Sequence, residues 1–355
     1  MKDNHTVIGF DAKRIVRNAT GLGNYGRTLV NNIMSECGDH DDFRLYAPDK
    51  GRDDLRQQIT LNKNSEFVYP RNTMFGFERS MWRMKDIVRD LKRDKVDIYH
   101  GLTGELPIGL RKSGVHGIVT IHDLIFLRYP QYYHWLDTKI YAYKFRITCR
   151  EAERIIAISE CTKRDIVEFG HVNPHKIKVI YQGCDDSFKH PVDDEKKHKV
   201  RLLYGLPMRY ILNVGSIEER KNVMLAVKAL HKLPDEVKLV IVGKQTTYTN
   251  QVLDYIDENN LHSRVLIISN LSFEDLPAVY QMAETFVYPS RYEGFGIPII
   301  EAINSGVPVV ACTGSCLEEA GGPHSLYVSP DDTDGMAEAV NRSLKGMEGR
   351  EERIT

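Results

Sequence analysis

The chain has 355 residues, of which 42% are hydrophobic and 27% charged, so its length and composition fit two globular domains with buried cores. Its formal net charge of −1 argues against a nucleic-acid-binding protein, since such proteins usually carry a strong basic excess. The six cysteines are scattered and the histidines dispersed, which indicates reduced thiols and no clustered zinc site. With no signal-peptide pattern and no run of roughly 18 apolar residues, we expect a cytoplasmic protein.

In the first half of the chain, short β-branched runs alternate with segments that have apolar residues at helical spacing. Strands are predicted at 6–10, 43–47, 66–69, 96–100, 117–122 and 154–159. Helices are predicted at 25–34, 77–92, 133–152 and 160–169. Because strands and helices alternate, we expect a parallel sheet with helices on both of its faces.

The segment 181–201 interrupts this pattern because it is polar, highly charged and contains a proline. We interpret it as a linker between an N-terminal Rossmann-like domain at 1–186 and a C-terminal one at 187–355. The alternation then resumes, with strands predicted at 210–215, 237–243, 264–269, 285–290 and 308–312 and helices at 222–232, 249–258, 273–283, 298–305 and 334–344. The predicted fold class is α/β, with two parallel sheets whose carboxyl ends face a cleft, where ligands of such folds bind.

The stretch SRYEGFGIPIIEA at 290–302 follows a predicted strand, so its glycines lie in a loop at the carboxyl end of that strand. Gly294 and Gly296 allow the backbone to pass close to a ligand, and the N-terminus of the next helix favours a phosphate. We expect Glu301, in the first turn of that helix, to accept hydrogen bonds from ligand hydroxyls. Glu293, in the loop, could hold a second polyol. The alternative is an ordinary strand–turn–helix connection in which both glutamates face solvent or the helix dipole.

A pair of cations follows the first predicted strand of the second half. Arg220 and Lys221 precede a helix whose N-cap is expected at Asn222. Two cations at this place suit a diphosphate, since arginine offers a planar fork and lysine a mobile point charge. The alternative is a pair of solvated side chains in a loop.

The glycine-rich segment ATGLGNYG at 19–26 separates the first predicted strand from the first helix. Gly21, Gly23 and Gly26 have the spacing of a dinucleotide-binding turn, but ten residues separate the strand from Gly21, and a Rossmann turn is much tighter. We therefore expect a mobile loop that caps the cleft. His122, in TIHDL, lies at the carboxyl end of a predicted strand and faces the predicted cleft, although a lone histidine can also be structural.

Taken in order, these segments resemble the family 4 retaining glycosyltransferases of GT-B architecture. The resemblance covers nearly the whole chain and includes GFDAKRIVRNATGLGNYG, TIHDL, RIIAISECTKRDI, VIYQGCD, LNVGSIEERKN and FEDLPAVYQMAETFVYPSRYEGFGIPIIEAINSGVPVVA. Its most specific piece is the E-x7-E element, here Glu293 to Glu301. The resemblance implies two Rossmann-like domains that face each other across a cleft and bind a nucleotide-diphosphate sugar.

Among family members the chain looks most like bacterial polysaccharide mannosyltransferases. That likeness implies transfer of a hexose, with mannose favoured, in surface-polysaccharide synthesis. It favours GDP-mannose as the donor, with a UDP-sugar as the alternative, and a glycan or lipid-linked glycan as the acceptor. It also implies peripheral contact with the inner face of the cytoplasmic membrane, and no nucleic-acid partner.

The resemblance implies roles for residues that match the family's motifs. The expected donor-binding residues are Arg220, Lys221 and Gly296 for the diphosphate, Glu301 for the ribose, and Glu293, Gly294, Phe295 and Gly296 for the sugar. The expected acceptor-side loop contains Gly21, Gly23, Asn24 and Tyr25. The expected catalytic residues are His122, beside the anomeric centre, together with Glu293 and Lys221.

The chain departs from the family pattern in two places. Many members carry an arginine where this chain has Ser216, so the diphosphate charge must rest on Arg220 and Lys221. Members usually end with a helix that crosses back onto the first domain, whereas this chain ends in the polar segment KGMEGREERIT, and we expect that helix to be missing or truncated.

The implied chemistry is group transfer with retention, in which the acceptor attacks on the face that the diphosphate leaves. No D-x-D motif lies at a strand end, so we expect transfer without a metal or cofactor. Three alternatives stay open: a GT-B-like nucleotide-sugar epimerase or hydrolase, a glycogen-type phosphorylase with lysine-bound pyridoxal phosphate, and a sugar-binding module without activity.

Overall fold

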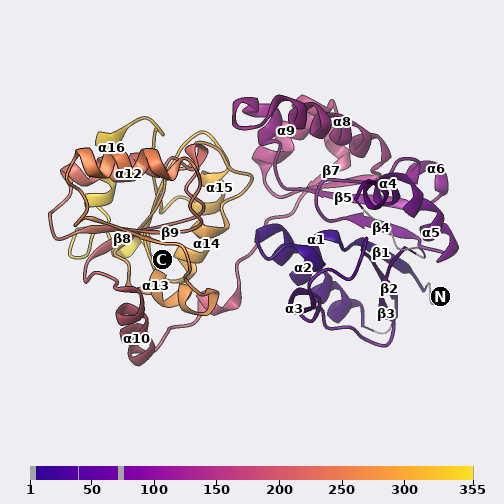
Figure 1. Cartoon of the computed structure of the whole chain (residues 1–355), viewed down its shortest axis with the longest axis horizontal. Helices are drawn as coiled ribbons and strands as arrows, with labels where there is room; N and C mark the ends of the chain where they lie inside the picture. Colours follow the sequence, from indigo (N-terminus) through magenta and orange to yellow (C-terminus); the bar gives the residue numbers. More distant parts are fainter. Residues whose placement is uncertain (1–4, 39, 71–75, 355) are drawn as a thin grey trace. The chain divides into compact units, whose positions relative to one another are not determined.

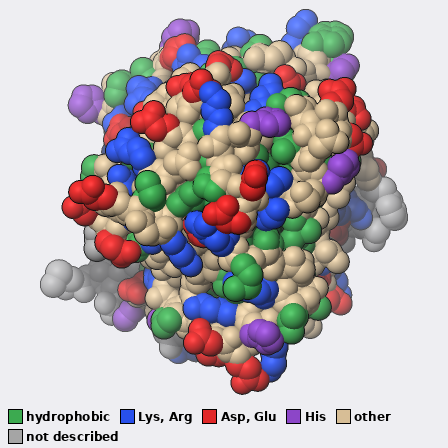
Figure 2. All heavy atoms as spheres, turned by 90° about the vertical axis from the view of Figure 1, so that its left-hand side faces the viewer, with side chains coloured by type: hydrophobic (Ala, Val, Ile, Leu, Met, Phe, Trp, Pro, Cys, Tyr) green, Lys and Arg blue, Asp and Glu red, His purple; other side chains and the backbone are tan. Residues whose placement is uncertain are grey.

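The computed structural model describes residues 5–38, 40–70 and 76–354, which form two compact units (Figure 1). The boundary falls between Ile180 and Tyr181, rather than after residue 186 as predicted. Acidic and basic side chains are interspersed over the face drawn in Figure 2, as the near-zero net charge leads one to expect. No helix among the described residues is both long and apolar enough to cross a bilayer.

The first unit is built on a seven-stranded parallel sheet with the order β3-β2-β1-β4-β5-β6-β7. Its strands are β1 (Val7–Asp11), β2 (Asp42–Tyr46), β3 (Ser65–Val68), β4 (Ile98–Gly101), β5 (His116–Ile121), β6 (Arg154–Ala157) and β7 (Ile177–Val179). Its helices are α1 (Lys13–Arg17), α2 (Gly21–Cys37), α3 (Asp53–Arg56), α4 (Phe77–Met81), α5 (Ile87–Arg93), α6 (Leu110–Ser113), α7 (Ile125–Arg128), α8 (Trp135–Glu151) and α9 (Glu160–Gly170). The predicted parallel sheet is confirmed.

Two hydrophobic cores cover the two faces of this sheet. Phe10 and Leu45 point into one core, which also holds Val30 of α2. Tyr46, one residue after Leu45, points into the other core with Phe145 of α8. This alternation follows from the period of two in a strand and explains why helices cover both faces. Figure 1 shows α1 to α3 on one side of the sheet and α8 and α9 on the other.

The second unit repeats this architecture with a six-stranded parallel sheet of order β10-β9-β8-β11-β12-β13. Its strands are β8 (Tyr210–Val214), β9 (Lys238–Val242), β10 (Val265–Ile268), β11 (Thr285–Tyr288), β12 (Val309–Cys312) and β13 (Leu326–Val328). Its helices are α10 (Asp194–Tyr204), α11 (Val223–Ala229), α12 (Thr249–Glu258), α13 (Leu276–Met282), α14 (Ile297–Asn304), α15 (Leu317–Gly321) and α16 (Thr333–Asn341). In Figure 1, α12 and α16 lie on one face of the sheet and α13 on the other.

The segment predicted to be a linker is instead part of the second unit. Residues 181–201 contain a 3₁₀ turn at Asp186–Lys189, whose Phe188 is fully buried, and the first two turns of α10. The side chain of Asp193 caps α10 by accepting from the Lys196 N–H at 2.7 Å. The charged composition therefore reflects an exposed helix rather than a linker.

The helix predicted at 77–92 is interrupted. A π-helical turn at Trp82–Asp86 separates α4 from α5. This turn directs Arg83 to the end of β1, where Nη2 lies 2.8 Å from Asp11 Oδ2. π-Helical turns within α-helices are frequent at functional sites.

Candidate active site

The candidate site of the second unit lies where the order of its strands reverses. β8 and β11 are neighbours in the sheet, but the chain proceeds from β8 to β9 on one side and from β11 to β12 on the other. The loops that leave their carboxyl ends, 215–222 and 289–296, diverge there and leave a crevice in which ligands of such folds bind. Both of the loops that the sequence singled out in this unit thus emerge at one point.

Backbone and side-chain hydrogen bonds join the two loops. The Arg291 N–H donates to the Arg220 carbonyl at 2.9 Å, and Arg220 Nη1 donates to the Tyr292 carbonyl at 2.5 Å. Asn222 Nδ2 donates to the Pro289 carbonyl at 3.1 Å. Asn222 is the N-cap residue of α11, as predicted, but it has a positive φ of 55° and its side chain makes no capping hydrogen bond.

The carboxylate of Glu293 is the centre of a buried ion cluster. Its Oε1 lies 3.0 Å from Arg220 Nη1 and 3.1 Å from Lys221 Nζ. Oε1 also accepts from Ser290 Oγ at 2.9 Å and from the Tyr288 hydroxyl at 3.2 Å. All four of these contacts are made by Oε1. The two cations and one carboxylate carry one net positive charge, which the partly exposed Glu218 balances, since its Oε2 lies 3.7 Å from Arg220 Nη2.

Electrostatics keep all three groups of this cluster ionised. Burial alone would raise the pKa of Glu293, but the charges of Lys221 and Arg220 outweigh it and lower that pKa to about 2. Burial opposes the charged forms of Lys221 and Arg220 as well, and the carboxylate of Glu293 nevertheless raises both pKa values. The cluster therefore keeps its charge throughout the physiological range of pH.

The position of Lys221 depends on two neighbours that the sequence did not single out. Nζ donates to the Tyr288 hydroxyl at 3.2 Å and lies 5.5 Å from the centre of that ring. Gly215 lies beneath the lysine with a φ of 149°, and a Cβ there would come within 3.3 Å of Lys221 Nζ. Glycine at this position gives the lysine room to lie across the end of β8.

Gly296, the residue before α14, has a φ of 122°, a value that strongly favours glycine. The backbone N–H groups of Phe295 and Gly296 make no hydrogen bond within the described part of the chain. The loop is held from behind by Cys316, whose Sγ contacts the carbonyls of Glu293 at 3.1 Å and Phe295 at 2.8 Å. With its carbonyls occupied, the loop has N–H groups available for an anion at the N-terminus of α14.

Glu301 lies one residue deeper in α14 than the predicted helix start at 298 implies. It is the fifth residue of the helix and therefore belongs to the second turn, and the prediction of the first turn is wrong. Its Oε2 accepts from the Tyr280 hydroxyl at 2.9 Å. Burial raises the pKa of Glu301 to about 7, against the smaller opposite effect of the Tyr280 hydrogen bond. No described cation forms an ion pair with Glu301.

In the first unit, His122 follows β5 directly, at the carboxyl edge of the sheet as predicted. Its Nε2 lies 2.9 Å from the Leu102 carbonyl, so Nε2 carries the proton and donates. Burial lowers the pKa of His122 to about 4, which keeps the ring neutral. Tyr25 packs edge-on against this ring at 4.7 Å and bonds to Thr120 at 3.0 Å. The structure thus brings two of the predicted residues of this unit together.

The predicted glycine-rich loop is wrong, because α2 begins at Gly21 and contains Gly23, Asn24 and Tyr25. The Asn18 side chain accepts from the N–H groups of Thr20 and Gly23 and so satisfies the start of the helix. A Cβ on Gly23 would lie 1.8 Å from the Asn18 carbonyl oxygen, which makes this glycine a packing requirement. Asn24 is engaged with the buried Arg27.

Ser216, at the position where many family members carry an arginine, lies beside the ion cluster without joining it. Its hydroxyl donates to Glu218 Oε1 at 2.5 Å. The cationic charge at the end of β8 therefore comes from Arg220 and Lys221, as expected for a chain with a serine in place of the family's arginine at position 216. Within the described ranges, no group of three or more His, Cys, Asp or Glu side chains has the geometry of a metal site.

Two family models match successive parts of the chain. The model described as Glycosyltransferase Family 4 matches residues 26–188, and that described as Glycosyl transferases group 1 matches residues 194–355. O-antigen chain mannosyltransferase B of Escherichia coli is 28% identical over 303 residues, which are 84% of this chain and 74% of that protein. O-antigen chain mannosyltransferase RfbU of Salmonella typhimurium is 28% identical over 224 residues, 62% of this chain and 59% of that protein.

Solved structures share the fold. The crystal structure of Anabaena Alr3699/HepE in complex with UDP and glucose matches 99% of this chain and 92% of that chain, with a TM-score of 0.73 and 18% sequence identity. Since the two family models between them match nearly all of the sequence, the chain belongs to the family 4-like glycosyltransferases, which makes it a hexose-transferring enzyme of GT-B fold.

Proposed function

We propose that this enzyme transfers a hexose, with retention, from a nucleotide-diphosphate sugar to a hydroxyl of a glycan or lipid-linked glycan. The observation that carries the proposal is the convergence of Arg220, Lys221 and Glu293 where β8 and β11 meet. Two relatives are O-antigen chain mannosyltransferases, which supports mannose as the sugar and surface-polysaccharide synthesis as the context.

The donor diphosphate would bind at the cluster. A diphosphate carries more negative charge than the single carboxylate of Glu293 and would attract both cations. The N–H groups of Phe295 and Gly296, at the start of α14, supply further donors. As the bond between the anomeric carbon and the phosphate oxygen lengthens, negative charge builds on the leaving diphosphate. Cations and N–H groups already fixed in place stabilise that charge without reorganisation.

The two glutamates would then bind different parts of the donor. Glu293 uses Oε1 for its four contacts, which leaves Oε2 for a hydroxyl of the donor sugar, next to the backbone of Gly294 and Phe295. Glu301 would accept from the ribose hydroxyls through its carboxylate. We propose GDP-mannose as the donor. A UDP-sugar is the competing candidate, because a structure that shares the fold holds UDP and glucose.

In the acceptor step, the donor itself supplies the group that takes the acceptor's proton. The acceptor oxygen forms a bond to the anomeric carbon on the face from which the diphosphate leaves, and its proton passes to the leaving phosphate oxygen. No metal or other cofactor enters this scheme. We propose that neutral His122 contacts a sugar hydroxyl through its ring, and that Tyr25, with Gly21, Gly23 and Asn24 in the same helix, belongs to the acceptor side.

The proposal is tested by ligand screening followed by product analysis. GDP-mannose and a panel of UDP-sugars are added to the protein, and the true donor should raise its melting temperature, because it binds only the native state. The anomeric configuration of the product is then read by NMR, with and without EDTA. Retention of configuration and unchanged rates in EDTA support the proposal. An epimerised or hydrolysed sugar, formed without an acceptor, would establish the epimerase or hydrolase alternative.

A further inference from the structure

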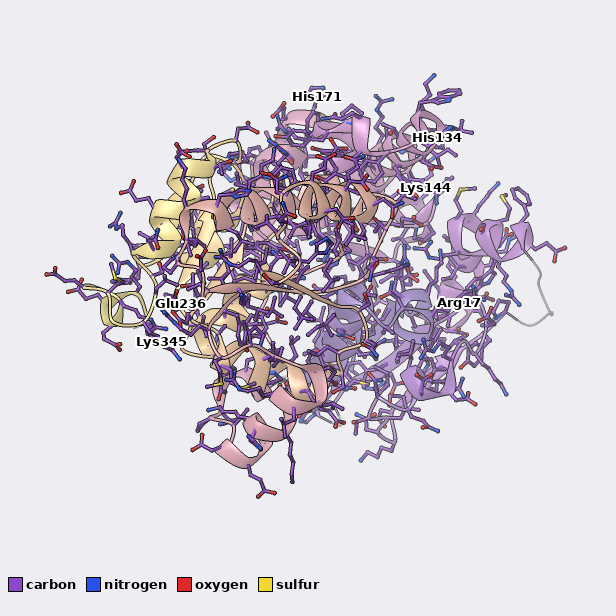
Figure 3. All side chains as sticks on the ribbon, turned by 60° about the vertical axis from the view of Figure 1, so that its left-hand side comes forward. Arg17, His134, Lys144, His171, Glu236 and Lys345 are labelled. Atoms are coloured by element: carbon purple, nitrogen blue, oxygen red, sulfur yellow. The ribbon has the colours of Figure 1, made fainter. Side chains whose placement is uncertain are left out.

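Two histidines at the carboxyl edge of the first sheet differ from exposed histidines elsewhere in the chain. His134 and His171, which Figure 3 labels, are exposed at the surface. His100, near the end of β4, is only 6% exposed, and burial lowers its pKa to about 4, so its ring is neutral. His122 follows β5, the neighbouring strand. A buried, neutral His100 does not meet a substrate directly, so any effect on the site passes through its neighbours.

A row of hydrogen bonds links His100 to α2. His100 Nε2 lies 2.9 Å from Thr120 Oγ1, and Thr120 Oγ1 lies 3.0 Å from the Tyr25 hydroxyl. Thr120 is completely buried between these two partners. A threonine hydroxyl has one proton to donate and lone pairs with which to accept, so it can bond to both neighbours whichever tautomer His100 adopts. The hydroxyl of Tyr25 is thereby held at a fixed point on the sheet.

The two ends of the Tyr25 side chain make different contacts. The hydroxyl bonds to Thr120, whereas the ring packs edge-on against the His122 ring, with 4.7 Å between ring centres and an angle of 88°. Thr120 and His122 are two positions apart at the end of β5, so their side chains leave the chain on the same face of the sheet. Tyr25 therefore lies along the end of β5 and covers one side of the His122 ring.

A second restraint on His122 comes from the segment that follows β4. Its Nε2 donates to the carbonyl of Leu102 at 2.9 Å, only two residues beyond His100. A Cβ on Gly26, the neighbour of Tyr25, would lie 3.5 Å from Leu102 Cδ1, so α2 is in close contact with this segment. The His122 ring is thus held by a hydrogen bond on its edge and by an aromatic ring beside it, and both restraints are anchored at the end of β4.

We propose that His100, Thr120 and Tyr25 are positioning residues, which hold the His122 ring in the orientation that the transfer reaction needs. His100 and Thr120 act through Tyr25, and Tyr25 acts through its ring contact with His122. The inference rests on the proposed function, because it takes His122 as a group that contacts the donor sugar. A hydrogen bond weakens steeply as its angle departs from linearity, so a His122 ring that is free to turn orients the sugar poorly.

The test removes the Thr120 hydroxyl and then restores it. Thr120→Val keeps the shape of the side chain and breaks both hydrogen bonds, whereas Thr120→Ser keeps the hydroxyl. Turnover is measured as release of GDP from GDP-mannose, or of UDP from the UDP-sugar that the ligand screen selects. We expect kcat to fall by about tenfold in Thr120→Val and in Tyr25→Phe, and Thr120→Ser to recover most of it.

The Michaelis constant separates positioning from binding. We expect KM for the donor to stay within about twofold of wild type in these variants, because the proposed diphosphate and ribose contacts belong to the second unit. A folded Thr120→Val enzyme with the kcat of wild type would overturn the inference. A serine variant that is as slow as the valine variant would overturn it too, since the hydroxyl would then not be the group that matters.

A matched control separates positioning from stability. Thr285 is as fully buried as Thr120, and its hydroxyl donates to the Ser343 carbonyl at the amino edge of the second sheet. Thr285→Val should lower the melting temperature as Thr120→Val does, but leave kcat within about twofold of wild type. Equal losses of kcat in the two valine variants would overturn the inference. The double variant Tyr25→Phe with Thr120→Val should be no slower than either single variant, because both changes break the same row.

Nitrogen NMR of the His122 imidazole, assigned by its loss in His122→Asn, reports on the ring without turnover. Wild type should show one tautomer, with the proton on Nε2 opposite the Leu102 carbonyl, and Thr120→Val should show exchange between tautomers. Unchanged His122 signals in that variant would overturn the inference. The proposed function fails separately if His122→Asn keeps kcat within about twofold of wild type, since the reaction would then not use this ring.

Discussion

Replacing Lys221 by methionine tests the donor site most directly, because the change removes the charge and keeps most of the volume. Lys221 Nζ lies 3.1 Å from Glu293 Oε1 in a largely buried position. Two unit charges at this separation attract each other by about 5 kcal/mol when the effective dielectric constant is ~20. A phosphate oxygen in place of the carboxylate would gain a similar attraction, partly offset by lost hydration. We therefore expect kcat/KM to fall by ~10²- to 10³-fold, equivalent to about 3–4 kcal/mol of transition-state stabilisation.

The fold should survive this change. Arg220 still neutralises Glu293 in the variant, so the loss of unfolding free energy should stay below about 3 kcal/mol, the low end for an uncompensated buried charge. The assay is initial-rate kinetics with the donor identified by screening. Lys228→Met is the matched control, because Lys228 is exposed on α11 and should leave kcat/KM within about twofold of wild type. A folded Lys221→Met enzyme that keeps kcat/KM within about threefold of wild type would refute the reasoning.

Three further predictions concern the same unit. In calorimetry, Glu301→Gln should lower the affinity for nucleoside diphosphate and for the full donor alike, by about tenfold. Glu293→Gln should lower the affinity for the full donor only, and it should maintain or raise the affinity for nucleoside diphosphate because it frees the two cations. Equal losses of affinity for both ligands in both variants would contradict this division. Because burial raises the pKa of Glu301 to about 7, the carboxyl is protonated below that pH and a poorer acceptor, so donor affinity should rise with pH through this range and lose that rise in Glu301→Gln. Gly296→Ala should lower the melting temperature and donor affinity, because φ is 122° and the new Cβ would lie 3.2 Å from Leu317; a variant that matches wild type in both measurements would show that the turn adapts.

The sequence predicted the parts of the site that follow from strand order. Arg220 and Glu293 come directly after neighbouring parallel strands, and parallel strands end at one edge, so their loops had to meet. The roles of Tyr288 and Ser290 could not be predicted in this way, because they depend on which way the side chains at the end of β11 point. The contact between Cys316 and the loop could not be predicted either, because it depends on where β12 lies in the sheet.

The errors in the prediction have local causes. α10 was missed because its sequence is mostly charged and only Val200 is buried, so it lacks a strong apolar stripe. The early start of α2 depends on the side chain of Asn18, which lies outside the helix and replaces a capping residue at the usual position. The short strand β7, at the edge of its sheet, carries too few residues for a period of two to be visible.

Glu293 also determines which ligands the site can attract. The carboxylate serves the two cations as an internal counter-ion, so a ligand binds by exchange rather than by filling an open positive pocket. A small anion with one negative charge gains little from that exchange, because it replaces a partner that is already fixed in place and desolvated. A ligand with several negative charges and a hydroxyl group can pair with both cations and also donate a hydrogen bond to the released carboxylate. We therefore expect simple monovalent anions to bind this site weakly.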